Sequence, residues 1–429
     1  MYTLLHNMNL IILITLTAAY VYQVVFTVIG LVSRKSRKEP EASKLHRFAA
    51  LICARNEENV IAQLVKTLKE QNYPKELFDI YVLADNCDDS TAAVAKNAGA
   101  FVYERQNKMK VGKGYALDYL IKKIKGEENY KPYDGYFIFD ADNIVDPNFV
   151  NEMNKTFDTG KYDAITCYRN SKNFGANWIS AGYSIWFLRE ARFINYPRRL
   201  MGTGCAVSGT GFLVSDKLIE ENGGWPFHLL TEDIQFSINC AVSGKKIGYC
   251  DSAVVYDEQP TTFSQSWKQR LRWSKGFFQV DAKYLVPLLK GFFGKKGNRF
   301  TCYDMFMTIA PCTLLTISVL IFNIMLCAGI FVLPYYKIYR IFHEAIHYAS
   351  WGVINFYIGM AIYALLVVLS EWKRINASAA DKLKYIWLFP LFMATYIPIT
   401  ITALLTHVEW SEIKHHAAGD FSLTTSKDM

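Results

Sequence analysis

Charged residues are scarce in this sequence, at 20% of its 429 residues, while 51% are hydrophobic. Soluble globular chains carry nearer a quarter of charged residues, and this balance excludes the disordered and fibrous classes. None of the nine cysteines is spaced C-x-x-C. That absence argues against a disulfide framework or a zinc site and favours a reducing compartment.

Long stretches near both ends contain no Asp, Glu, Lys or Arg. A helix needs about 20 apolar residues to cross the hydrocarbon core of a bilayer. Four stretches meet this requirement: 1–33, 305–333, 350–370 and 385–406. The first lacks a basic leading region and an A-x-A cleavage site, so we expect a retained membrane anchor rather than a signal peptide.

The net charge of +8 does not predict a nucleic-acid partner, because many basic residues lie beside the apolar stretches. The run from Arg34 to Lys38 follows the first stretch directly, whereas residues 1–8 have no basic side chain. Lys and Arg mark the cytoplasmic side of a membrane. We therefore expect an integral protein of the bacterial plasma membrane whose central domain is cytoplasmic. Four crossings would leave the tail from His407 outside, unless one segment is re-entrant.

The middle of the chain alternates between apolar runs and helical patterns. The runs at 49–53, 79–84, 100–103 and 136–139 are typical of buried strands. Such alternation predicts right-handed βαβ units and a parallel sheet, whose ligands bind at the carboxyl ends of the strands. No G-x-G-x-x-G follows the first strand, which disfavours a dinucleotide site.

Acidic clusters follow three of these strands, at 55–58, 85–90 and 140–142. A single D-x-D is most often a solvated turn, but three clusters at successive strand ends favour a common site. Two carboxylates spaced as Asp140 and Asp142 suit a hard divalent cation, which commonly bridges substrate phosphates.

Further motifs each have a simpler alternative. The segment 108–114 opens a helix at Lys113 and is suited to a diphosphate, although it is not a Walker A motif. Ser208–Gly211 resembles a tight turn that lines a pocket. Thr231-Glu232-Asp233 fits an ordinary helix N-cap as well as a catalytic group. The basic, aromatic stretch 267–293 equally fits an amphipathic anchor at a membrane interface.

Taken in order, the motifs resemble those of family 2 glycosyltransferases. They are similar in particular to the membrane-integrated branch with cellulose, chitin, hyaluronan and poly-N-acetylglucosamine synthases. The resemblance covers roughly residues 48–280. It rests on Ala54-Arg55-Asn56-Glu57, Asp85-Asn86, Asp140-Ala141-Asp142, Thr231-Glu232-Asp233 and Gln269-x-x-Arg272-Trp273.

This resemblance implies an α/β fold of the GT-A (Rossmann-like) type and inverting transfer from a nucleotide-sugar. The cytoplasmic catalytic domain would be flanked by transmembrane and interfacial helices. The expected division is a transmembrane helix at 1–33, a basic linker at 34–47, the GT-A domain at 48–260, interfacial amphipathic helices at 261–300, three transmembrane helices at 301–408 and a tail at 409–429.

The resemblance also implies donor-binding residues, position by position. Ala54 and Glu57 would border the nucleoside, and Asp85 would hydrogen-bond the uracil of a UDP-sugar. Lys113 matches a lysine near the diphosphate. The remaining donor and acceptor motif is Gln269, Arg272 and Trp273, although Trp273 equally suits a membrane interface.

Metal and catalytic roles follow in the same way. Asp140 and Asp142 match the D-x-D that holds the donor and a divalent metal, Mg²⁺ or Mn²⁺, with Asp142 the direct ligand. Asp233 matches the general base, and Glu232 its neighbour near the acceptor.

Some features depart from the large synthases. Only one predicted helix precedes the catalytic domain, and no F-x-V-T-x-K segment lies between the later helices. The segment 407–416, which contains Trp410, is best interpreted as an interfacial anchor. A metal site at the neighbouring His415 and His416 is disfavoured.

The leading hypothesis is a hexosyl- or N-acetylhexosaminyltransferase that elongates a polysaccharide and passes it through its own membrane helices. The alternative is transfer of a single sugar to a membrane lipid, giving a glycolipid. A transporter or a non-catalytic scaffold is disfavoured. Transport sites usually place charges within the spans, and these four spans have none. A decayed enzyme would have lost some of its catalytic carboxylates, whereas Asp140, Asp142 and Asp233 are all present.

Overall fold

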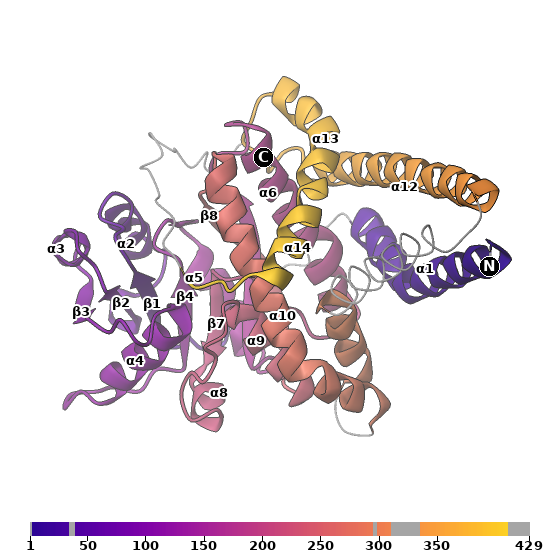
Figure 1. Cartoon of the computed structure of the whole chain (residues 1–429). Helices are drawn as coiled ribbons and strands as arrows, with labels where there is room; N and C mark the ends of the chain where they lie inside the picture. Colours follow the sequence, from indigo (N-terminus) through magenta and orange to yellow (C-terminus); the bar gives the residue numbers. More distant parts are fainter. Residues whose placement is uncertain (1, 34–38, 295–297, 310–334, 411–429) are drawn as a thin grey trace.

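The computed structural model describes residues 2–33, 39–294, 298–309 and 335–410. A central α/β domain is joined on one side by helices from both ends of the chain (Figure 1). Several predicted features lie outside the described residues: the basic run 34–38, positions 310–333 of one expected span, Cys312, Cys327, His415 and His416. The seven cysteines within the described ranges are free thiols.

Four parallel strands form the first half of the sheet, in the order β3-β2-β1-β4. They are β1 (Phe48–Ala54), β2 (Phe78–Asp85), β3 (Phe101–Arg105) and β4 (Gly135–Phe139). The connecting helices are α2 (Ile61–Lys69), α3 (Thr91–Asn97) and α4 (Lys113–Lys125). β1 and β4 are apolar along their length because helices cover both faces of the sheet. All four strands predicted from the sequence are confirmed.

The second half of the sheet is mixed, so the prediction of a wholly parallel sheet is wrong there. The short β7 (Phe212–Ser215) runs antiparallel to both of its neighbours, β4 and β6. The chain enters β7 at the edge where β4 ends, through a turn with left-handed Gly209 (φ 85°) and Gly211 (φ 67°). The remaining strands are β5 (Ile144–Val145), β6 (Ala164–Ser171) and β8 (Ile247–Asp257).

A hydrophobic layer covers each face of the sheet. One contains α2 and α5 (Phe149–Asp158), represented by Leu64 and Met153. The other contains α4, α6 (Trp178–Arg189) and α9 (Glu232–Val242), and it continues without a break to Val367 and Phe392 near the C-terminus. The α/β domain and the C-terminal helices therefore share one core. The short α8 (Asp216–Glu221) follows β7.

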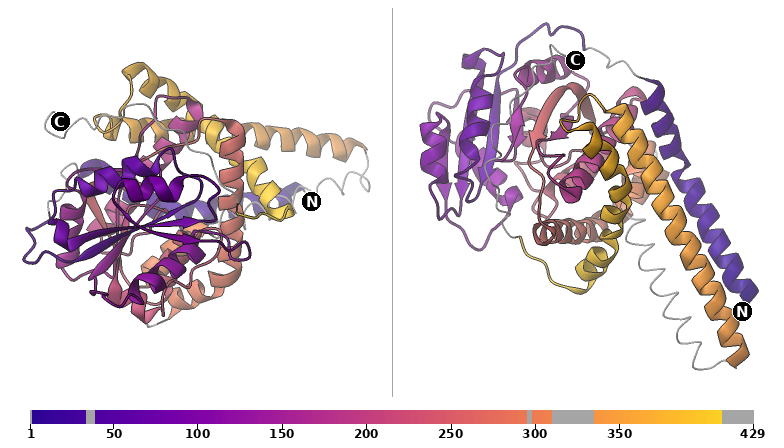
Figure 2. Two further views of the ribbon diagram at one scale, coloured as in Figure 1. Left: turned by 90° about the vertical axis from the view of Figure 1, so that its left-hand side faces the viewer. Right: turned by 90° about the horizontal axis from the view of Figure 1, so that it is seen from above.

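Two long helices, α1 (Tyr2–Val32) and α12 (Tyr335–Ser370), extend from the same side of the α/β domain (Figures 1 and 2). Among the described residues, two helical stretches are long and apolar enough to cross a bilayer, Ala349–Ser370 and Ala379–Leu405. Both coincide with predicted spans. The described apolar part of the first helix, Thr17–Val32, is shorter.

The segment expected as the last span is divided into α13 (Ala379–Ala394) and α14 (Tyr396–Leu405). The fully buried Arg270 of α10 (Phe263–Phe293) donates hydrogen bonds to Phe392 O (3.2 Å) and Thr395 Oγ1 (2.6 Å) at the bend. Pro398 has no N–H for the helical ladder, which weakens the helix at this point. Arg270 therefore ties the bend to the helix that carries Gln269 and Arg272.

Two buried polar contacts hold the long helices to the domain. Arg198 of α7 (Tyr196–Leu200) pairs with Asp304 at 2.7 Å, and Tyr22 of α1 donates to the same carboxylate (3.0 Å). The second contact lies directly after α12. There Tyr168 of β6 donates to Glu371 (2.6 Å), and Arg374 pairs with Asp251 of β8 (3.0 Å).

Candidate functional site

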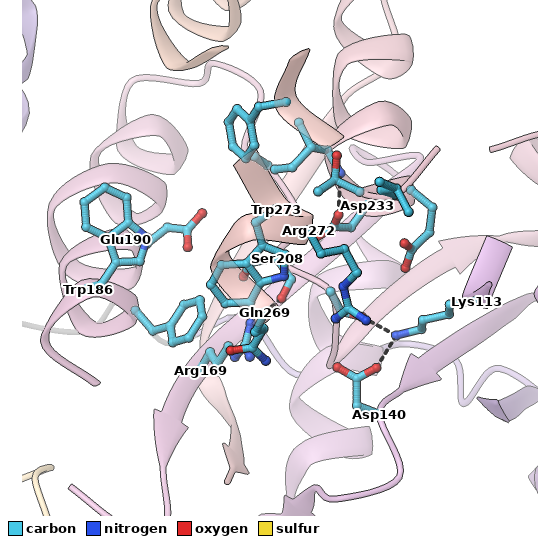
Figure 3. Close-up of a pocket in the computed structure, with 18 of the residues that line it drawn as sticks. Lys113, Asp140, Arg169, Trp186, Glu190, Ser208, Asp233, Gln269, Arg272 and Trp273 are labelled. Atoms are coloured by element: carbon cyan, nitrogen blue, oxygen red, sulfur yellow. Dashed lines mark hydrogen bonds and ion pairs between the residues drawn. The ribbon is translucent and has the colours of Figure 1, made fainter. Parts of the chain in front are cut away.

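A cavity of about 580 Å³ opens where β1, β2 and β4 end (Figure 3). Its walls come from the loops after these strands, the Ser208–Gly211 turn, the start of α9 and one face of α10. All eleven residues singled out from the sequence line it: Ala54, Glu57, Asp85, Lys113, Asp140, Asp142, Glu232, Asp233, Gln269, Arg272 and Trp273.

Asp85 lies at the end of β2 and is only 6% exposed. Its carboxylate accepts a hydrogen bond from Arg105 Nη1 at 2.8 Å. Burial raises the pKa of Asp85, and the positive charge of Arg105 opposes that effect. Arg105 was not predicted as a site residue from the sequence. Its place in the sequence gave a signal, because Arg105 closely follows the predicted strand at 100–103. In the structure Arg105 ends β3 and is the register partner of Asp85 on β2.

The loops after β1 and β2 hold each other in place. Asn56 (φ 54°) and Asn86 (φ 56°) both have left-handed backbones, which asparagine tolerates better than most residues. The Asn56 side chain accepts from Asp88 N (2.9 Å), and that of Asn86 accepts from Asn107 N (2.7 Å). These bonds fix the loops that carry Glu57 next to the end of β2.

Lys113 begins α4 and reaches across the cavity to two partners. Its ammonium group pairs with the Asp140 carboxylate and donates to Gly209 O at 2.6 Å. Burial alone would lower the pKa of Lys113, but the charges of Asp140 and Glu232 outweigh it and the net shift is upward. Lys113 is therefore a firmly charged cation within the cavity.

Asp140 and Asp142 supply carboxylate oxygens at the end of β4. Asp142 is 6% exposed and accepts hydrogen bonds from Glu258 N (3.1 Å) and Asn143 Nδ2 (3.4 Å). The neighbouring Asp257 has one buried oxygen, Oδ1, that finds no hydrogen-bond partner among the described residues. Among the described residues no group of three or more His, Cys, Asp or Glu is arranged as a complete metal site. The oxygen donors nevertheless fit Mg²⁺ or Mn²⁺ if substrate phosphates complete the coordination.

Glu232 and Asp233 form the first turn of α9. Thr231 occupies the N-cap position, but its hydroxyl makes no capping hydrogen bond, so the simple capping interpretation of this motif is not sufficient. Burial raises the pKa of Glu232 to about 7, and the charge of Asp233 adds to the shift. Burial also raises the pKa of Asp233, although a hydrogen bond from Ile234 N (2.8 Å) opposes it.

Gly209 lies between the two acidic groups. A Cβ added there would lie 3.6 Å from Asp233 Oδ2, 3.8 Å from Asp140 Oδ2 and 4.0 Å from Arg169 Nη1. The absence of a side chain, on a backbone of positive φ, keeps this space open. The carboxylates of β4 and α9 therefore face a common space.

Arg272 and Trp273 enter the cavity from α10. Burial lowers the pKa of Arg272, and the charge of Glu232 is the largest effect that opposes it. The ring of Trp273 packs edge-to-face on Tyr183 (5.7 Å) and Phe187 (6.2 Å) of α6. Trp273 therefore forms a wall of the cavity together with α6, a role that leaves the membrane-interface interpretation unnecessary.

Arg169 and Trp410 also line the cavity, although neither was predicted from the sequence to be a site residue. Arg169 of β6 donates to Asp257 (2.7 Å) and to Ser208 O (2.5 Å), and its position inside a strand gave no signal. Trp410 was expected to be an interfacial anchor, and this expectation is wrong. The Trp410 ring centroid lies 5.1 Å from the guanidinium carbon of Arg55 and 5.8 Å from that of Arg272, and the side chain lines the cavity.

Comparison with known proteins identifies related chains. Probable glycosyltransferase YdaM from Bacillus subtilis (strain 168) is 25% identical over 309 residues, which cover 67% of each protein. A beta-monoglucosyldiacylglycerol synthase from Nostoc sp. is 27% identical over 285 residues, 64% of this chain and 57% of that protein. The poly-beta-1,6-N-acetyl-D-glucosamine synthase of Staphylococcus aureus (strain MSSA476) is 27% identical over 275 residues, 62% of each. The matched region thus spans less than two thirds of the length of either synthase.

The fold is also found in a solved structure. The mannosyltransferase PcManGT from Pyrobaculum calidifontis, in complex with GDP-Man and Mn²⁺, superposes with a TM-score of 0.55 at 14% identity, covering 90% of this chain and 96% of that one. This likeness supports the predicted GT-A architecture. Residues 46–276 match the sequence profile of the family described as "Glycosyltransferase like family 2". Because that match covers more than half of the chain, the protein belongs to glycosyltransferase family 2 and is a sugar transferase.

Proposed function

We propose that the protein transfers a hexosyl or N-acetylhexosaminyl group from a UDP-sugar, with inversion, to a growing polysaccharide. The observation that carries this proposal is the convergence of Asp140, Asp142 and Asp233 with Lys113 and Arg272 in one cavity. The relative from Staphylococcus aureus, named as a poly-beta-1,6-N-acetyl-D-glucosamine synthase, supports a polysaccharide product.

The donor would lie along the carboxyl edge of the sheet. Asp85, held by Arg105, is placed to accept from the uracil N–H, and Ala54 and Glu57 border the same end of the cavity. Breaking the anomeric C–O bond leaves negative charge on the diphosphate. A divalent cation on Asp140 and Asp142 supplies charge neutralisation when bound.

The chain's own cations would act on the same leaving group. Lys113 and Arg272 both line the cavity, and stabilising charge that develops in the transition state is usually the largest single catalytic effect. Gln269 lies one helical turn before Arg272 on the same wall. Its side-chain amide is suited to the diphosphate or the acceptor.

Asp233 would be the general base. Its carboxylate faces the space beside Gly209 that also faces Asp140, so an acceptor hydroxyl there has a base on one side and the donor on the other. Asp233 would take the hydroxyl proton as that oxygen attacks the anomeric carbon opposite the leaving group, which inverts the configuration. General base catalysis contributes about 10²–10⁴-fold.

A second candidate is transfer of a single sugar to a membrane lipid. The cavity continues against apolar side chains of the terminal helices, including Met307, Ile309 and Met393. A relative from Nostoc sp. is named as a beta-monoglucosyldiacylglycerol synthase. Both candidates use the same donor site and differ in the acceptor.

We also propose that residues 1–33 and 301–408 cross the bacterial plasma membrane, with the catalytic domain on the cytoplasmic side and the polymer leaving between these helices. The two apolar stretches Ala349–Ser370 and Ala379–Leu405 support a membrane location. Labelling of an engineered surface cysteine in intact cells and in lysed cells measures which side the domain faces.

The test uses purified protein in nanodiscs with a panel of radiolabelled UDP-sugars. Donor use identifies the sugar, and product size on a gel separates polymer from glycolipid. Asp233→Asn should abolish transfer while UDP binding, measured by calorimetry, persists. Glu220→Gln, a change of an exposed acid on α8, is the matched control and should leave both unchanged. Near wild-type transfer by Asp233→Asn would refute the catalytic assignment.

A further inference from the structure

The cavity extends well beyond the residues assigned to the donor. Besides the residues assigned to the donor, it is lined by Trp186 of α6 and by the carboxylate-bearing Glu190. In Figure 3, Lys113 lies at one end of the labelled group and Glu190 at the other, with Trp273 between them. An acid at this end is not explained by metal binding or by proton removal.

Glu190 occupies an unusual place in the chain. α6 ends at Arg189, and Glu190 begins a π-helical segment, η2 (Glu190–Asn195), before the chain continues as α7. π-helical turns are rare and frequently occur at functional sites. The change of winding therefore coincides with the residue that lines the cavity.

The Glu190 side chain forms no hydrogen bond or ion pair within the part of the chain that the structure describes. Its charge is influenced by three nearby arginines and by Asp233, and burial raises its pKa. Each arginine has another partner for its guanidinium. These partners are Asp257 for Arg169 (2.7 Å), Asp304 for Arg198 (2.7 Å) and Gln23 for Arg189 (3.3 Å).

A carboxylate in a partly desolvated cavity is costly unless hydrogen-bond donors reach it. Hydroxyl groups on a sugar ring are such donors, and the apolar face of the ring packs well on an indole. Both Trp186 and Trp273 line the cavity together with Glu190. The combination matches a carbohydrate ring better than an alkyl chain.

We propose that Glu190 is an acceptor-binding residue whose carboxylate accepts hydrogen bonds from hydroxyl groups of a sugar ring at the end of the acceptor. The proposal rests on the proposed function and narrows it. The acceptor then carries a sugar that rests on the Trp186 and Trp273 side of the cavity. A lipid alcohol with a single hydroxyl and no ring does not satisfy this site.

The experiment compares wild type, Glu190→Gln and the control Glu128→Gln, an exposed acid outside the cavity. Each protein in nanodiscs receives the UDP-sugar that the donor panel identifies. The acceptor is either a short oligosaccharide of the same sugar or diacylglycerol. UDP release is measured with and without acceptor. UDP binding reports folding, and Glu190→Asp provides a second, charge-conserving variant.

We expect Glu190→Gln to raise the KM for the oligosaccharide about tenfold or more, as hydrogen bonds to a charged group are lost. In Glu190→Gln, hydrolysis of the UDP-sugar without acceptor and the affinity for UDP should stay within twofold of wild type. The oligosaccharide KM of Glu190→Asp should be intermediate, and that of Glu128→Gln should match wild type. An unchanged oligosaccharide KM in Glu190→Gln would overturn the proposal, as would a wild-type enzyme that uses diacylglycerol and ignores the oligosaccharide. Absence of UDP release from every UDP-sugar by wild type would instead refute the proposed function itself.

Discussion

The indole ring of Trp410 lies over the guanidinium group of Arg272, with 5.8 Å between the ring centroid and Cζ. The same ring lies 5.1 Å from Cζ of Arg55, so one aromatic side chain contacts two cations of the cavity. Cation–π contacts of this kind contribute about 0.5–2 kcal/mol, with the larger value at desolvated sites.

We expect Trp410→Ala to lower kcat/KM for the donor about three- to thirtyfold, because Arg272 loses the ring that orients it. Trp410→Phe keeps an aromatic face and should retain most of the activity. Initial rates at varied UDP-sugar concentration measure the effect. Equal kcat/KM values for wild type and Trp410→Ala would show that the tail does not order the arginines.

Arg105 is expected to set donor affinity through Asp85. Arg105→Gln leaves the buried Asp85 carboxylate without its charged partner, and breaking a buried pair in this way is strongly unfavourable. The KM for the UDP-sugar should rise about tenfold or more while kcat changes little. Lys96→Gln, a change of an exposed residue on α3 outside the cavity, is the control. A reduced kcat at unchanged KM would contradict a role at the nucleoside end.

The acidic pair at the start of α9 predicts a pH dependence. Burial raises the pKa of Asp233 above its usual value and that of Glu232 to about 7. Because a general base must be deprotonated, kcat/KM should rise with pH through the weakly acidic range. Rates between pH 5 and 8 in buffers of constant ionic strength test this expectation. A flat profile would exclude a buried base with a raised pKa.

Metal removal should stop transfer. Asp140 and Asp142 are carboxylates suited to a hard cation, and excess EDTA should abolish activity, with recovery on addition of Mg²⁺ or Mn²⁺. Calorimetry should detect Mn²⁺ binding to wild type in the presence of UDP and weaker binding to Asp142→Asn. Undiminished activity in EDTA would contradict the metal role of both aspartates.

The contact between Arg198 and Asp304 is expected to carry much of the stability of the helical region. Both side chains are almost fully buried, at 2% and 1% exposed. Asp304→Asn leaves the Arg198 charge unpaired and should reduce the free energy of unfolding by about 3–5 kcal/mol. The surface pair of Glu41 and Lys155 provides the control. Glu41 is 85% exposed, so Glu41→Gln should cost about 1 kcal/mol or less. Thermal unfolding in nanodiscs measures both, and equal losses would contradict the expectation.

The strands of the first half of the sheet were predictable because buried parallel strands are continuous apolar runs, as in Phe48–Ala54 and Gly135–Phe139. The direction of β7 was not, since a four-residue strand carries no sign of its orientation. That orientation depends on the turn at Gly209 and Gly211. The bend at Thr395 likewise depends on Arg270, which lies 125 residues earlier in the chain.

The candidate site was predictable where short motifs carry its residues. Asp140 and Asp142, or Glu232 and Asp233, are neighbours in sequence and follow a strand or begin a helix. Trp410 and Glu190 belong to no such motif. Trp410 contacts Arg55 and Arg272, which are far from it in the sequence, so only the folded structure brings them together. Glu190 is a single acid within a helical stretch and is not part of an acidic cluster.

The buried contacts directly after α12 have a mechanical consequence. Glu371 and Arg374 fasten the end of this helix to Tyr168 of β6 and Asp251 of β8. β8 ends at Asp257, which lines the cavity. The end of α12 is therefore joined by side-chain contacts to the strand whose last residue lines the cavity. We therefore expect a tilt of α12 either to break these contacts or to displace β8, and with it the part of the cavity wall that Asp257 forms.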